Sequence, residues 1–120
     1  MTFDWKQYYE IAKFLHGDIL IELPNEASLR SSVSRAYYSA FCLARNFAII
    51  HRHFEPFHDD RDHKNLIENF RVGKFSQVAA RLQRLREWRN ASDYQDEIEN
   101  LELMCNAAIE ATAKILNAIK

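Results

Sequence analysis

The scarcity of glycine and proline constrains the fold of this chain more than any other feature. Its 120 residues include only Gly17, Gly73, Pro24 and Pro56 of these two types. A β-rich fold needs frequent turns, which glycine and proline supply, so this chain favours long helices joined by few connections. The length and the 48% hydrophobic content suit one domain, residues 1–120, with enough apolar surface for a core.

Apolar residues recur at helical spacing in five segments, which are about 3–23, 26–54, 63–71, 74–90 and 96–119. The sequence therefore predicts an all-α fold, an antiparallel helical bundle with four long helices and one short helix. Asn25 and Asp62 are the expected N-caps of the second and third helices. Gly73 is expected to mark the end of the third helix.

The second segment has apolar residues on more than one side. Besides its broad apolar arc, it carries Tyr38, Cys42 and Ile49 on the other side of the helix. A helix of this kind either packs on two sides within the domain or uses one side as a subunit interface.

Charge and composition exclude several classes of protein. The formal net charge is −1, which gives no footprint for nucleic acid at the level of the whole chain. The N-terminus does not resemble a signal peptide, and no apolar run approaches the length of a membrane span, so we expect a cytoplasmic protein that makes no membrane contact. Cys42 and Cys105 lie among apolar residues and are expected to be free thiols. Glycine-rich phosphate loops and nucleophile elbows are absent, which disfavours most familiar enzyme classes, and no cofactor is expected.

Arg89 is the most informative single position. It falls on the same helical face as Val78, Leu82 and Leu85, so the helix aims a guanidinium along its core-facing stripe. An arginine is rarely buried without partners because removing its charge from water is costly. One interpretation is structural: Arg89 extends out to solvent from the last helical turn, or it forms an ion pair with Asp93 or with an acid of the fifth helix. The other is functional: Arg89 lies in a cleft where it binds a phosphate.

The fourth segment is locally basic and the chain that follows it is acidic. Residues 74–90 include five lysines and arginines but only one glutamate. These charges either form a solvated face neutralised by the neighbouring helix, or Arg86 and Arg89 form an anion site large enough for one or two phosphates.

Four histidines, His51, His53, His58 and His63, lie within thirteen residues beside several aspartates. A zinc site needs three or four converging ligands, and a helix brings together residues at i and i+4. The histidine spacing does not match this pattern, so no metal site is expected. His51 is instead expected on the core face of the second helix.

Two stretches of the chain together resemble the HEPN domain family. The first is Ser34-Arg35-Ala36-Tyr37-Tyr38-Ser39-Ala40-Phe41, and the second runs from Leu85 through Arg89-Asn90-Ala91-Ser92-Asp93-Tyr94. The order of elements, with a short helix led by a histidine near His63, is also similar over nearly the whole chain. The resemblance implies a HEPN-like bundle that forms a homodimer, with the arginine motif lining a cleft between subunits.

The family includes metal-independent ribonucleases, often toxins paired with a nucleotidyltransferase-like antitoxin, as well as non-catalytic binding modules. In the ribonucleases a histidine follows the arginine after four to six residues, and here Tyr94, Gln95 or Asp96 stands in those places. The missing histidine leaves catalysis open, because tyrosine is a poor base near neutral pH. Asp93 could accept the proton instead, or His58 or His63 could be supplied from elsewhere in the fold, and the sequence does not decide between them.

The resemblance marks candidate catalytic residues and candidate ligand-binding residues for RNA or a nucleotide. The catalytic candidates are Arg89, Asn90, Asp93 and Tyr94, and the ligand-binding candidates are Arg35, Tyr38, Arg86 and Arg89. The alternative is a non-catalytic interaction protein whose partner is nucleotidyltransferase-like or another protein.

Overall fold

The computed structural model describes residues 3–17 and 25–120, apart from the side chain of Asn25. The regular elements within these residues are five helices, which are α1 (Lys6–Gly17), α2 (Asn25–His51), α3 (Arg61–Phe70), α4 (Ser76–Tyr94) and α5 (Leu101–Ala118). The predicted all-α class is confirmed for the part of the chain that is described. None of these helices combines the length and the apolar content that a membrane crossing requires.

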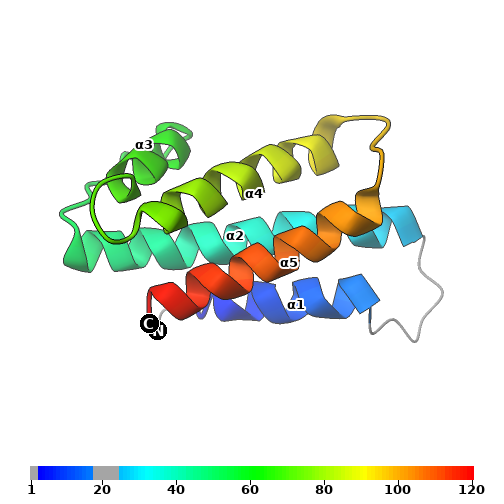
Figure 1. Cartoon of the computed structure of the whole chain (residues 1–120), viewed down its shortest axis with the longest axis horizontal. Coiled ribbons are helices and arrows are strands. Elements are labelled where there is room, and N and C mark those ends of the chain that lie inside the picture. Colours follow the sequence, from blue (N-terminus) through cyan, green and yellow to red (C-terminus); the bar gives the residue numbers. More distant parts are fainter. Residues whose placement is uncertain (1–2, 18–24) are drawn as a thin grey trace.

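The long helix α2 is the central element, and it packs against each of the other four helices. In Figure 1, the axes of α1, α2, α4 and α5 run in roughly the same direction, and successive helices of this set point in opposite chain directions. The short helix α3 packs against α4 and α2 at the end of the molecule where α2 finishes. The candidate residues on α2, α3 and α4 therefore belong to helices that are in mutual contact.

Small residues allow α2 to have close neighbours on several sides. Ala36 and Ala40 are completely buried. The Ser32 hydroxyl donates a hydrogen bond to the carbonyl oxygen of Ala12 on α1 at 2.7 Å. On α5, the Thr112 hydroxyl donates a hydrogen bond to the carbonyl oxygen of Ala36 on α2 at 3.2 Å. These bonds satisfy two buried hydroxyls and fix α2 against both neighbours.

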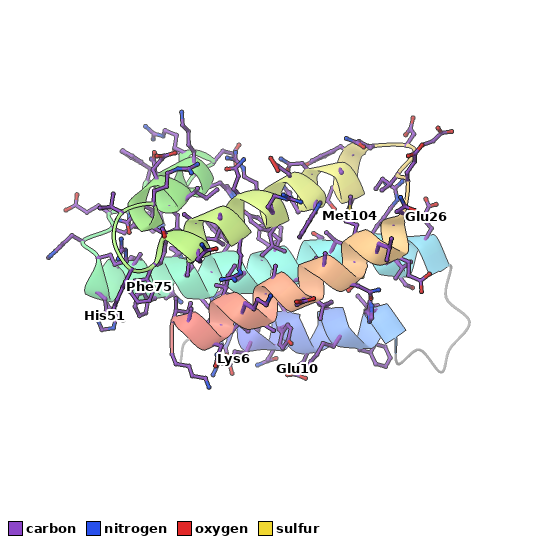
Figure 2. All side chains as sticks on the ribbon, in the orientation of Figure 1. Lys6, Glu10, Glu26, His51, Phe75 and Met104 are labelled. Carbon is purple, nitrogen blue, oxygen red and sulfur yellow. The ribbon has the colours of Figure 1, made fainter. Side chains whose placement is uncertain are left out.

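The predicted limits of α2 were wrong at its C-terminal end. The helix finishes at His51, and His53 adopts a left-handed backbone with φ of 55°. Phe54 is nevertheless buried, because the chain folds back so that its N–H donates to the carbonyl of Ala48 at 3.2 Å. The core position predicted for His51 was also wrong. His51 is exposed at the end of α2 (Figure 2), where its ring lies 4.7 Å from that of Phe47.

The first and fifth helices are shorter than the periodicity predicted over the described residues. The predicted end of the first helix lies outside those residues, and Ile11, predicted on its apolar face, is exposed. The last helix begins at Leu101 instead of residue 96, because Asn100 before it is in the left-handed region with φ of 56°.

Asp62 is not the N-cap of α3, as the sequence suggested. The helix begins at Arg61, and Asp62 lies buried in its first turn. The Asp62 carboxylate accepts hydrogen bonds from the backbone N–H groups of Phe57 at 2.7 Å and His58 at 2.9 Å. Asp62 therefore stabilises the loop before α3 by closing it onto the helix.

The fourth helix continues one turn beyond its predicted end at Asn90 and finishes at Tyr94. Arg30 of α2 holds this end, because its guanidinium donates to the backbone carbonyl oxygens of Ser92 at 3.0 Å, Gln95 at 2.5 Å and Asp96 at 3.1 Å. The segment from residue 89 to residue 94 is thus helical and anchored to α2.

Candidate functional site

A polar cavity of about 230 Å³ lies where α2, α4 and the start of α3 meet. It is lined by seven residues, which are Tyr38, Asp60, His63, Arg86, Arg89, Asn90 and Tyr94. Five of these were site candidates from the sequence, and the structure brings them together. Asp60 was not a candidate, and His63 was named only as one of two histidines, with His58, that could reach the site from elsewhere in the fold.

Arg89 enters the cavity from the inward face of α4. Val78, Leu82 and Leu85 on the same face are buried, and the Arg89 side chain is 19% exposed, as the helical periodicity predicted. Its Nε lies 2.9 Å from the carboxylate of Asp93, one turn later on α4. This Nε is buried and has no hydrogen-bond partner among the described residues, so the contact is an ion pair without a directed hydrogen bond.

The remaining contacts of Arg89 are aromatic and polar. Its guanidinium carbon lies 5.1 Å from the ring centre of Tyr38 and 5.7 Å from that of Tyr94. Its Nη1 donates a hydrogen bond to the side-chain oxygen of Asn90 at 3.0 Å. Cation–π contacts of this kind hold a guanidinium in place while leaving its edge free for an anion.

His63 is the residue that sequence reasoning failed to place in the site. Its Nδ1 forms a hydrogen bond with the hydroxyl of Tyr37, and its ring stacks on Phe41 with centres 4.3 Å apart. Burial lowers the pKa of His63, and the positive charges of Arg86 and Arg89 lower it further. The spacing of His63 before Leu66, Ile67 and Phe70 matches one helical face, which was a usable signal.

Tyr37 is a completely buried partner for this imidazole. Burial raises the pKa of its phenol well above the ordinary value of 10, so the hydroxyl stays protonated at neutral pH. A phenol can donate to a neutral imidazole nitrogen or accept from a protonated one. Tyr37 therefore fixes the His63 ring in either protonation state.

Two candidates point to a neighbouring hollow instead of the arginine cavity. Arg35 is exposed, and its guanidinium carbon lies 4.9 Å from the ring centre of Tyr8 on α1. Arg35 and Asp93 both line a separate hollow with Arg30. Arg35 therefore does not belong to the site of Arg89, and Asp93 reaches that site only through its ion pair.

The other three histidines of the cluster lie outside the cavity. His51, His53 and His58 are exposed. The described residues hold no group of three or more histidine, cysteine, aspartate or glutamate side chains that is suited to a metal ion. Cys42 and Cys105 are buried free thiols, and burial raises the pKa of each, which makes them unreactive as thiolates.

The cavity combines two guanidinium groups, one imidazole, two phenols and one amide with a single carboxylate. Such a lining suits an anion with several oxygen acceptors, and the exposed Tyr94 offers a flat ring at the edge. Comparison with known proteins adds no assignment, since no family model, no curated protein and no solved structure matches this chain.

Proposed function

We propose that this protein is a HEPN-type module that binds a phosphate-bearing ligand, RNA or a nucleotide, in the cavity of Arg86 and Arg89. The observation that carries the proposal is the convergence of these two arginines with Tyr38 and Tyr94 in one polar cavity. Arginine binds phosphate through paired N–H donors, and tyrosine rings stack on bases. The family resemblance of the two sequence motifs supports the same assignment.

The size of the cavity limits what can enter it. A volume of about 230 Å³ admits a phosphate group with part of its sugar, but not a duplex. The exposed ring of Tyr94 at its edge suits a single unpaired base beside that phosphate. The ligand class is therefore a nucleotide or an unpaired position of single-stranded RNA.

Ribonuclease activity without a metal is the further step of this proposal. Cleavage by the 2′-hydroxyl needs a group that moves protons near neutral pH, and the family motif histidine is absent from α4. His63 is the cavity residue with an imidazole. An assay of RNA cleavage therefore belongs beside every binding measurement, with a His63 variant included.

A second candidate function is an interaction protein without catalysis, partnered by a nucleotidyltransferase-like or other protein. The observation that favours it is the ion pair between Arg89 and Asp93, whose side chains are 19% and 28% exposed. In this interpretation the pair is structural, and the site binds no phosphate.

Replacing Arg89 distinguishes the two functions. Arg89→Ala should abolish phosphate binding or RNA cleavage, because it removes a sheltered charge-assisted contact that contributes about 1.5–3 kcal/mol. Arg84→Ala is the matched control, since Arg84 is an exposed arginine on the same helix outside the cavity. It should cost under about 1 kcal/mol.

Thermal melting and ligand titration should be measured on the same Arg89→Ala sample. If Arg89 only completes a structural ion pair, its removal leaves Asp93 without a partner and lowers the free energy of unfolding by at most about 3–5 kcal/mol, because both side chains are partly exposed to solvent. A large loss of stability together with no ligand bound by the wild-type protein would refute the phosphate site and favour the interaction protein.

A further inference from the structure

His63 reaches the cavity of Arg86 and Arg89 from a different helix, α3. We infer that His63 is a third anchor for phosphate in this cavity, and that it makes the site selective for a terminal phosphate monoester over an internal phosphodiester. The inference rests on the proposed phosphate site and names the class of phosphate that the site takes.

The position of the His63 ring is fixed before any ligand binds. Its Nδ1 is taken by the hydroxyl of Tyr37, and its face is covered by Phe41. Nε2 is therefore the ring nitrogen left for a ligand. Because the Tyr37 hydroxyl can either donate or accept, the ring can gain a second proton without losing this partner, and Nε2–H is then a donor for the ligand.

The charge of the lining depends on that proton. The two arginines and Asp60 give the lining a formal charge of +1 when His63 is neutral and +2 when it is protonated. A phosphodiester carries one negative charge, whereas a terminal monoester carries about 1.5 to 2 near pH 7. Asp93, which pairs with Arg89 outside the lining, lowers both totals by one. In either case the monoester, with its greater negative charge, gains more from the protonated ring than the diester does.

The groups around His63 determine when it takes up a proton. Burial, Arg86 and Arg89 lower its pKa, while Asp60 and Asp62 oppose that shift. A bound phosphate dianion offsets the two arginines and raises the pKa of His63, so binding of a monoester should take up a proton. The titratable and charged groups that face His63 are Tyr37, Tyr38 and Arg45 of α2, His58, Asp59 and Asp60 of the loop, Asp62 of α3, and Arg86 and Arg89 of α4.

Nuclear magnetic resonance can follow the imidazole of His63 directly, with the signal assigned by its loss in His63→Asn. The probes are inorganic phosphate, adenosine monophosphate and the methyl phosphodiester of adenosine monophosphate. Phosphate and adenosine monophosphate should each raise the pKa of His63 by about one unit, which corresponds to about tenfold in affinity. The methyl ester, which carries a single negative charge, should raise it by clearly less.

Affinity gives an independent measurement. At about pH 6.5, adenosine monophosphate should bind the wild-type protein about tenfold more tightly than its methyl ester, and this ratio should fall towards one in His63→Asn. Asparagine can still pair with the Tyr37 hydroxyl but offers no group in place of Nε2. His58→Asn is the matched control, because the exposed His58 lies outside the cavity and its left-handed backbone, with φ of 66°, suits asparagine.

The outcomes separate this inference from the proposed function. Equal affinity for the monoester and the methyl ester, or binding of phosphate with no change in the pKa of His63, would overturn the inference and leave the phosphate site standing. Binding of none of the three probes by the wild-type protein would overturn both. The pKa measurement uses the wild-type protein, so it does not depend on how well His63→Asn folds.

Discussion

At the scale of single residues, Arg89 is held by contacts from two helices. On α4 it shares a face with the buried Leu82 and Leu85, and its Nε lies 2.9 Å from the carboxylate of Asp93. Its guanidinium also lies over the ring of Tyr38 on α2. The inward direction of Arg89 follows from spacing within α4, whereas its contact with Tyr38 depends on how α4 packs against α2.

The pH dependence of stability tests the environment of His63 at this scale. Its pKa in the folded protein is below the ordinary value of 6.5, so the unfolded chain binds the proton more tightly. The free energy of unfolding should therefore be highest above about pH 6.5 and should fall as the pH decreases from there towards the folded pKa. One proton accounts for a slope of at most about 1.4 kcal/mol per pH unit.

Urea unfolding at a series of pH values measures this slope. His63→Asn should make this slope smaller, because it removes the imidazole that titrates. The substitution also removes the stacking of His63 on Phe41, so the slopes of the two proteins are compared and not their absolute stabilities. His58→Asn is the matched control for the loss of an imidazole, because His58 is exposed and lies outside the cavity. Identical slopes in the wild type and His63→Asn would contradict the environment described for His63.

At the scale of elements, α3 explains why part of the site was missed. The sequence predicted a short helix over about residues 63–71. In the structure this helix begins two residues earlier, at Arg61, and ends one residue earlier, at Phe70. His63 shares a face with Leu66, Ile67 and Phe70, all of which are buried. The face was therefore predictable, but its partner was not, because the rotation and position of α3 against α4 depend on contacts distant in sequence.

The end of α4 was also misplaced, and Arg30 provides the physical reason. A helix end leaves carbonyl groups without partners inside the helix. Arg30 of α2 satisfies the carbonyls of Ser92, Gln95 and Asp96 near this end. Local sequence marks no such cap, because the donor stands more than sixty residues earlier in the chain.

Removing this cap should loosen the helix end that carries Tyr94. Arg30→Met keeps an apolar stem but loses the three hydrogen bonds to this helix end and the exposed pair with Glu26, so the free energy of unfolding should fall by about 1–3 kcal/mol. Amide hydrogen exchange over residues 91–95 should become faster than in the wild type. Arg71→Met is the control, since Arg71 forms an exposed pair with Glu68 and should cost under about 1 kcal/mol. Unchanged exchange at the end of α4 in Arg30→Met would refute the capping role.

For the whole molecule, composition and periodicity predicted the helical class and the approximate position of all five helices. They did not predict that α2 would contact every other helix. This central position removes part of the surface that the sequence offered for a subunit interface. Cys42 is buried within the domain and Tyr38 lines the cavity, so Ile49 is the exposed member of that group, beside the more exposed Ile50.

We still expect the isolated chain to dimerise, through the exposed end of α2 or the region of Arg89. Sedimentation of the protein at tens of micromolar, on the order of the concentrations at which weak association becomes visible, should show a dimer.

If the end of α2 forms the interface, Ile50→Asp should give a monomer, because Ile50 is 74% exposed and an aspartate there would have to be desolvated on association. Leu103→Asp on α5, at a side chain 66% exposed, is the matched control and should remain a dimer. A dimer that survives Ile50→Asp would direct attention to the Arg89 region. A wild-type monomer at these concentrations would eliminate a cleft shared between two subunits and require the cavity of Arg86 and Arg89 to act within a single chain.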